Sequence, residues 1–283
     1  MRVREMDFLL MRSEPNLMLL FLSRAFPPPA GFTAIPPYSD CRIFRRALWQ
    51  RNCGACAAFA VSTLVAMHVC LRSGEDFIPS PYWIFDCANG TCGSGLTFDA
   101  AISAVQFDVG DVHDSVARFG LPCDYPKRKE DLVPHGFTPI TLYDPAEIKT
   151  ALMLFGPLLG SMTHAIRRDP YTRAYRLLPN LTNIDRLHAV VVVGWDAADN
   201  WIVQNSWGER WGDGLGRGRI AQDVLGSVFD PSVRLLTRGC LVAYYAVTVA
   251  SVLLATRPSH RLAFAVVGGT TFVCMLRSAW RVL

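Results

Sequence analysis

The chain has 283 residues, of which 51% are hydrophobic and 18% charged, a composition that excludes an intrinsically disordered protein. The net charge is only +4, and no basic run exceeds Pro126-Lys127-Arg128-Lys129, so the sequence lacks the electrostatic signature of a nucleic-acid-binding protein. Nine cysteines, an odd number, indicate disulfides plus at least one free thiol and favour an oxidising compartment.

Residues 1–34 are predicted to be a leader or signal-like segment. Three arginines precede a short apolar core at residues 17–22, and Ser23-Arg24-Ala25 resembles a signal-peptidase site. The apolar core is shorter than that of a usual signal peptide, so a disordered or packed N-terminal arm is the alternative. The prolines at 27–29 and 36–37 indicate an extended linker.

Two helices are predicted from hydrophobic periodicity. Apolar residues recur at helical spacing over 56–72 without an interrupting Gly or Pro, which indicates a long buried helix with His68 as a core histidine. A second helix is expected over 145–155, ended by Gly156-Pro157.

The pattern then changes to short β-branched runs. Residues 189–193 and 201–203 are bounded by Gly and Asp and predict strands. Helices followed by strands indicate an α+β fold with two segregated lobes.

The C-terminus carries two uncharged stretches, of 16 residues at 241–256 and 15 residues at 262–276. Each is shorter than the roughly 20 residues of a membrane-spanning helix. A membrane-associated tail at 248–283 and a core strand followed by a packed helix both fit this pattern.

Three chemistries fit Cys53-Gly54-Ala55-Cys56 at the start of the long helix. A redox dithiol would exploit the helix N-terminus, and a zinc site could form together with Cys87 and Cys92. Alternatively, Cys56 is a lone nucleophile while Cys53 is bonded elsewhere. A nucleophilic thiol needs an imidazole and a polar partner for that imidazole, and His188 and Asn205 follow Cys56 by 132 and 149 residues.

These motifs resemble the papain-like cysteine peptidases, over residues 35 to about 247. The resemblance rests on the Cys56 motif, His188 before an apolar strand, Asn205-Ser206-Trp207-Gly208, and Cys92-Gly93-Ser94-Gly95. It implies a two-lobed fold with a helical lobe at about 40–140 and a β-barrel-like lobe at about 141–247, separated by the active-site cleft.

The resemblance also implies roles for individual residues. Cys56 would attack the peptide carbonyl as a thiolate whose pKa is lowered by His188 and by the helix N-terminus. His188 would protonate the leaving amine, Asn205 would orient its ring, and Gln50 would stabilise the oxyanion together with the Cys56 backbone N–H.

Substrate contacts are implied for Gly95, Ser94, Trp207 and Ala189. The resemblance further implies the disulfides Cys53–Cys92 and Cys87–Cys123, no metal and no cofactor. Protein or peptide substrates and a secretory or endolysosomal-type compartment are expected, with membrane association through the tail as an additional expectation. An endopeptidase is expected because no His-His insert lies between Cys123 and Pro145.

Three departures from the family pattern stand out. Ala57 replaces the Trp that normally follows the nucleophile, Leu187 precedes the histidine where many members carry Asp or Asn, and Cys41 lies where a Trp is usual. Residues 1–34 are also shorter than the family's long inhibitory pro-region. The rival interpretations are a catalytically weak papain-fold binding protein, a membrane-tethered structural protein and a thiol-disulfide oxidoreductase.

Overall fold

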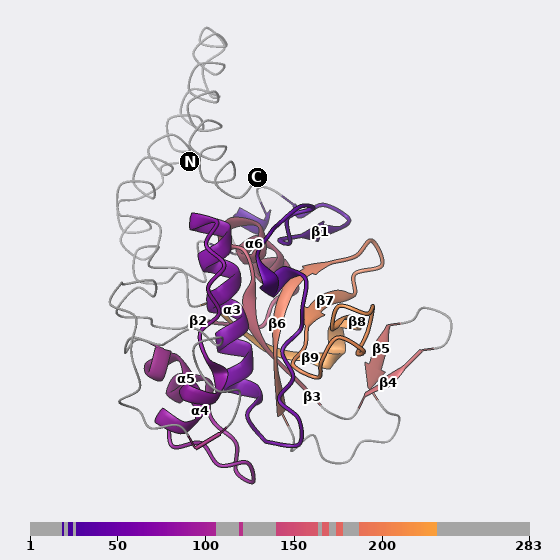
Figure 1. Ribbon diagram of the computed structural model, residues 1–283. Helices are drawn as coiled ribbons and strands as arrows, with labels where there is room; N and C mark the ends of the chain where they lie inside the picture. Colours follow the sequence, from indigo (N-terminus) through magenta and orange to yellow (C-terminus); the bar gives the residue numbers. More distant parts are fainter. Residues whose placement is uncertain are drawn as a thin grey trace, which may run out of the picture.

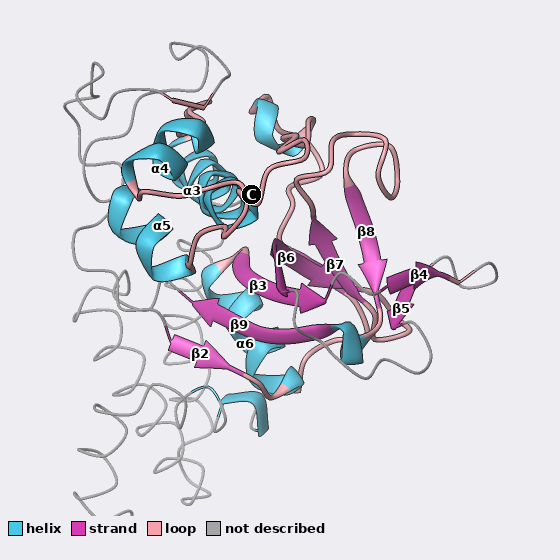
Figure 2. Ribbon diagram, turned by 90° about the horizontal axis from the view of Figure 1, so that it is seen from below, coloured by secondary structure: helices cyan, strands magenta, loops and turns pink. Residues whose placement is uncertain are grey.

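The computed structural model describes Leu19 and residues 22–24, 27–105, 119–120, 140–163, 166–169, 174–177 and 187–230. Helices α3 (Cys56–Ser73), α4 (Pro81–Cys87) and α5 (Phe98–Val105) gather on one side of the molecule. The strands lie on the other side, as the two views in Figure 1 and Figure 2 show. This arrangement confirms the predicted α+β fold.

The long helix α3 is the centre of the helical side. Its 18 residues are mostly buried, and it ends at Gly74, whose φ of 73° and N–H bond to the Cys70 carbonyl cap the last turn. The Ser80 side chain caps the start of α4. The predicted long buried helix is therefore confirmed.

One mixed sheet of nine strands forms within the described residues, in the order β2-β9-β3-β6-β7-β8-β5-β4, with β1 paired to β6. The strands are β1 (Phe32–Thr33), β2 (Ile140–Leu142), β3 (Leu158–Thr163), β4 (Ile166–Arg168), β5 (Tyr175–Leu177), β6 (Leu187–Trp195), β7 (Trp201–Gln204), β8 (Arg217–Ile220) and β9 (Leu225–Asp230). Strands β6 and β7 confirm the two strands predicted from the sequence.

Strand β6 serves both hydrophobic cores because its side chains alternate between the two faces of the sheet. Val191 and Val193 belong to the core around α3. Val190 and Val192 belong to the second core, which includes Leu152 of α6 (Pro145–Phe155). A strand buried on both faces explains the continuous apolar run in the sequence.

Helix α6 begins and ends where the sequence predicts. The Asp144 carboxylate accepts hydrogen bonds from the N–H groups of Ala146 and Glu147, and Pro145 occupies the first turn. The helix ends at Gly156, which has a φ of 90°.

The described part of the predicted leader packs on the sheet. Strand β1 pairs with Gly194 and Trp195 at the end of β6, and the Trp195 indole N–H donates to the Pro29 carbonyl at 3.0 Å. Residues 27–34 therefore form part of the folded domain, whereas most of residues 1–26 lie outside the described residues.

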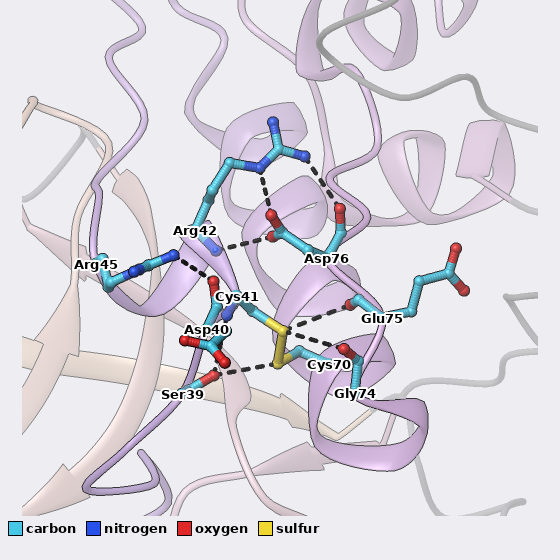
Figure 3. A network of polar contacts seen from close by, with 9 residues as sticks. All are labelled: Ser39, Asp40, Cys41, Arg42, Arg45, Cys70, Gly74, Glu75 and Asp76. Carbon is cyan, nitrogen blue, oxygen red and sulfur yellow. Dashed lines mark hydrogen bonds and ion pairs between the residues drawn. A yellow bond between two sulfur atoms is a disulfide. The ribbon is translucent and has the colours of Figure 1, made fainter.

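A disulfide that the sequence analysis did not anticipate joins Cys41 to Cys70 near the C-terminal end of α3 (Figure 3). Both residues are buried. Beside the disulfide, the Arg42 side chain donates to the Asp76 carboxylate at 2.6 Å, and the Arg42 N–H donates to the same carboxylate at 2.8 Å. Cys41 therefore covalently attaches the N-terminal segment to the central helix.

We expect the Cys41→Ala/Cys70→Ala double variant to lose about 2–4 kcal/mol of unfolding free energy, because the bridge restricts the unfolded chain. Denaturant titration of native and variant protein measures this difference. Unchanged stability would show that the bridge contributes nothing to the fold.

His68, predicted to be a core histidine, is half-buried on α3. Its Nε2 lies 2.9 Å from the Pro157 carbonyl oxygen. Burial, together with the nearby positive charge of Arg72, lowers the pKa of His68 from 6.5 to about 4.

Because the pKa of His68 is lower in the folded chain, the unfolded chain binds more protons between the two pKa values. Stability is therefore lost as the pH falls below 6.5. Denaturant unfolding at about pH 7 and about pH 4.5 should show a smaller loss in His68→Gln than in the native chain. An equal loss in both proteins would contradict this assignment.

Helix α3 is also the helix among the described residues that is long and apolar enough to span a membrane, and most of it is buried in the domain. The predicted membrane-associated tail at 248–283 lies outside the described residues.

Candidate active site

Cys56 lies at the first residue of α3 and is the free cysteine among the described residues. The segment before it is fixed by the Cys53–Cys92 disulfide and by the Gly54 N–H, which donates to the Cys92 carbonyl at 3.1 Å. A Cβ at Gly54 would lie 2.8 Å from that carbonyl oxygen, so the close approach requires glycine. This contact holds the nucleophile candidate in one position.

The backbone N–H of Ala189, at the start of β6, acts on the Cys56 thiol and favours its charged form. Burial raises the pKa of the Cys56 thiol, and hydrogen bonds from the N–H groups of Ala189, Ala57 and Cys56 itself oppose that shift. The expectation of a lowered thiol pKa is therefore not met, because desolvation of the anion outweighs the donors of the helix N-terminus.

His188 begins the buried part of β6 and is only 1% exposed. Its Nε2 lies 2.7 Å from the Asn205 side-chain oxygen Oδ1, which also accepts the Ser206 N–H at 2.7 Å. The backbone donor fixes which atom of the amide faces the ring. Because Oδ1 only accepts hydrogen bonds, a neutral His188 carries its proton on Nε2, and Nδ1 is the basic nitrogen.

Trp207 covers this pair. Its ring is stacked on the His188 ring, with centroids 4.5 Å apart and planes 22° apart, and it meets the edge of Trp211 at 5.8 Å. The indole limits the access of water to the His188–Asn205 hydrogen bond.

Gln50 is buried and fixed at both ends of its side-chain amide. Its Oε1 accepts the Ser206 hydroxyl at 2.5 Å, and its Nε2 donates to the Cys53 carbonyl at 2.8 Å. These partners define the orientation of the amide and leave the second Nε2 hydrogen for another acceptor. Gln50 thus joins the segment before α3 to the segment after β7.

The four residues expected to contact the substrate lie in different parts of the site. Gly95 has a φ of 77° and lies against Gly54, close to the start of α3. The exposed Ser94 hydroxyl lies 2.5 Å from the Thr91 hydroxyl. Trp207 and Ala189 lie beside His188 and Cys56 respectively.

The disulfides discriminate between the three chemistries of the cysteine motif. Cys53 is bonded to Cys92, as the resemblance implies, so Cys53 and Cys56 do not form a dithiol pair. Cys87 is also disulfide-bonded, and Cys123, its expected partner, lies outside the described residues. A zinc site built from these cysteines is therefore contradicted, and no group of three or more metal-ligand side chains occurs within the described part of the chain.

The two departures next to the candidate catalytic residues have different consequences. Ala57 is 3% exposed, and its small side chain packs in the core around α3. Leu187 is 64% exposed at the start of β6, and its side chain projects from the opposite face of the strand to that of His188.

Comparison with known proteins identifies the family. The profile of the papain family cysteine proteases matches residues 38–226. The chain belongs to this family.

It is 28% identical to mouse (Mus musculus) cathepsin K over 173 residues, 58% of this chain and 52% of that protein. It is 26% identical to human (Homo sapiens) cathepsin O over 208 residues, 67% of this chain and 62% of that protein. The matches span less than two thirds of these relatives.

Solved structures share the fold. A digestive procathepsin L 3 of Tenebrio molitor larval midgut superposes with a TM-score of 0.57 at 20% identity, covering 72% of this chain and 70% of that chain. The proCathepsin B S9 from Trypanosoma congolense gives a TM-score of 0.52 at 18% identity, covering 72% and 77%. These likenesses support the two-lobed papain-like fold.

Ser206 also belongs to the site, although its functional role could not be predicted from the sequence. Its N–H orients Asn205 and its hydroxyl holds Gln50. The only signal was its place between Asn205 and Trp207, and a serine in a turn has many ordinary uses.

The raised thiol pKa yields a prediction about alkylation. In His188→Gln, no imidazole accepts the proton of Cys56, so alkylation should reach its half-maximal rate above about pH 8.5, the ordinary cysteine pKa. Native protein should react at lower pH because His188 takes the proton. Iodoacetamide labelling followed by peptide mapping measures both profiles, with Cys56→Ser as the control for other thiols. Identical pH profiles in the native protein and in His188→Gln would show that His188 does not accept the proton of Cys56.

Proposed function

We propose that this cysteine peptidase is an endopeptidase that hydrolyses peptide bonds through Cys56, His188 and Asn205. The observation that carries the proposal is the position of one free thiol. Cys56 interacts with the Ala189 N–H, and the adjacent residue is His188, whose ring is oriented by Asn205.

The reaction follows from the proton positions. The Cys56 proton passes to His188 Nδ1, and the attraction between the resulting ions offsets the desolvation of the buried thiolate. The sulfur attacks the carbonyl carbon, His188 returns the proton to the leaving nitrogen, and the C–N bond breaks to give a thioester. Water, deprotonated by His188, then attacks the thioester and releases the acid and the thiol.

The developing oxyanion has two candidate donors. One is the second Nε2 hydrogen of Gln50, whose orientation is set by Ser206 and Cys53. The other is the backbone N–H of Cys56 at the start of α3, where helix amides have no partner within the helix.

The backbone of Gly95 is proposed to contact the acyl part of the substrate, with Ser94 at its exposed edge. Ala189 is proposed to contribute its small side chain to the site, and Trp207 to shield the ion pair. No metal or organic cofactor takes part in this mechanism.

An oxidising secretory or endolysosomal-type compartment is proposed for this chain. The disulfides Cys41–Cys70 and Cys53–Cys92 support it, because such bonds are rare in a reducing cytosol. Membrane association through the tail at 248–283 stays a prediction.

Turnover of fluorogenic peptides tests the proposal. Native protein with added thiol should cleave a peptide with two basic residues before the scissile bond, or one with a hydrophobic residue at the second position before that bond. Cys56→Ala should lose this activity. Equal circular dichroism spectra would show that both proteins are folded. A folded native chain that cleaves none of several peptides would instead support a papain-fold binding protein.

Removal of the Gln50 amide should lower kcat by about 100- to 1,000-fold, the usual loss for one oxyanion donor. The variant is Gln50→Ala, with Gln50→Glu as a second change that keeps the size of the side chain. Labelling of Cys56 by an epoxide inhibitor shows whether the thiol is still accessible. A fall in kcat of less than about tenfold would exclude Gln50 as an oxyanion donor.

A further inference from the structure

An exposed tryptophan lies next to the candidate oxyanion donor. Trp49 is 60% exposed, although its neighbour Gln50 is buried. Its backbone forms a β-bridge with Trp207, and the Gly208 N–H donates to the Leu48 carbonyl at 3.1 Å. A large apolar side chain is thus held at the surface by the segment that covers His188.

Arg51 lies on the other side of Gln50 in an uncommon backbone conformation. Its φ is 57°, in the left-handed region that glycine adopts without strain and other residues adopt at a cost. Its guanidinium lies 5.6 Å from the centroid of the Trp49 ring, within the range of a cation–π contact. A strained position occupied by a long exposed side chain indicates a role for that side chain.

The direction in which a substrate would bind determines which part of it lies near Trp49 and Arg51. In the proposed mechanism His188 protonates the leaving nitrogen, so the leaving part of the substrate lies on the side of His188 and Trp207. Trp49 is bridged to Trp207, whereas Gly95 lies against Gly54. Trp49 and Arg51 therefore flank the residues that follow the scissile bond.

The Arg51 guanidinium places a positive charge beside Trp49. Within the described part of the chain no carboxylate forms an ion pair with Arg51. A guanidinium in contact with an indole face keeps N–H donors for a bidentate carboxylate partner.

We propose that Trp49 and Arg51 form a carboxylate-binding site for the leaving part of the substrate. This inference rests on the proposed peptidase activity. The bound carboxylate is either an acidic side chain close behind the scissile bond or the terminal carboxylate of a short leaving peptide.

Matched internally quenched peptides test the site. One pair differs only by Glu or Gln at the second position after the scissile bond, and another ends there in a free carboxylate or an amide. The preferred carboxylate should raise kcat/KM by about three- to fivefold at low ionic strength, as expected for an exposed ion pair. The preference should shrink as salt is added. The pair that shows the effect identifies the source of the carboxylate.

Variants connect the preference to the two residues. Arg51→Gly removes the guanidinium at a φ that glycine tolerates, so the variant should fold. It should reduce the ratio of kcat/KM between the carboxylate peptide and its uncharged partner to about one. Arg51→Lys should keep part of the preference, and Trp49→Ala should reduce it because the guanidinium loses its support. Arg45→Ala is the matched control, since Arg45 is also exposed but donates to the Asp40 carbonyl, and it should keep the native ratio.

Two readouts separate this inference from the proposed function. Cleavage of a peptidyl dye without a leaving peptide reports the peptidase activity alone. The dissociation constants of the same peptides for Cys56→Ala report recognition without turnover, and they should show the same ratio. Ratios near one in native turnover and in binding, or a ratio that survives Arg51→Gly, would overturn the carboxylate site.

Discussion

The candidate site depends on the pairing of residues 48–50 with residues 206–208. The Gln50 N–H donates to the Ser206 carbonyl at 2.9 Å, and the Gly208 N–H donates to the Leu48 carbonyl at 3.1 Å. The Ser206 hydroxyl adds a bond to the Gln50 side chain. This pairing joins the segment that leads into α3 to the segment that leaves β7. The oxyanion candidate and the histidine partner are therefore positioned by the same contact.

Such positioning matters because fixed donors need not reorganise as charge develops. Ser206 contributes twice, since its N–H orients the Asn205 amide and its hydroxyl orients the Gln50 amide. The first interaction determines which nitrogen of His188 is basic, and the second determines where a hydrogen of Gln50 points. Burial raises the thiol pKa, so the thiolate depends on proton transfer to that basic nitrogen rather than on the helix N-terminus alone.

The parts of the fold that could be predicted from the sequence are those that local patterns determine. Helix α3 has an unbroken apolar repeat, and β6 is a β-branched run buried on both faces. The positions of Cys56, His188 and Asn205 followed from their spacing and from a family resemblance. The Cys53–Cys92 bond came from that same resemblance.

Other features depend on contacts between distant segments, which no local pattern encodes. The Cys41–Cys70 bond forms because the N-terminal segment crosses the end of α3, and neither cysteine carries a sign of its partner. The packing of residues 27–34 depends on the free end of β6. Trp49 is exposed although its backbone pairs with Trp207, whereas an aromatic residue is more often expected in a core.

The central claim is that Ser206 and Asn205 make Nδ1 of His188 the proton acceptor for Cys56. The most direct test is the ¹⁵N NMR spectrum of the histidine rings in Cys56→Ala at a pH where His188 is neutral. The six histidines can be distinguished by comparison with His188→Gln. We predict a His188 ring protonated at Nε2 and unprotonated at Nδ1. A proton on Nδ1 in the neutral ring would contradict it.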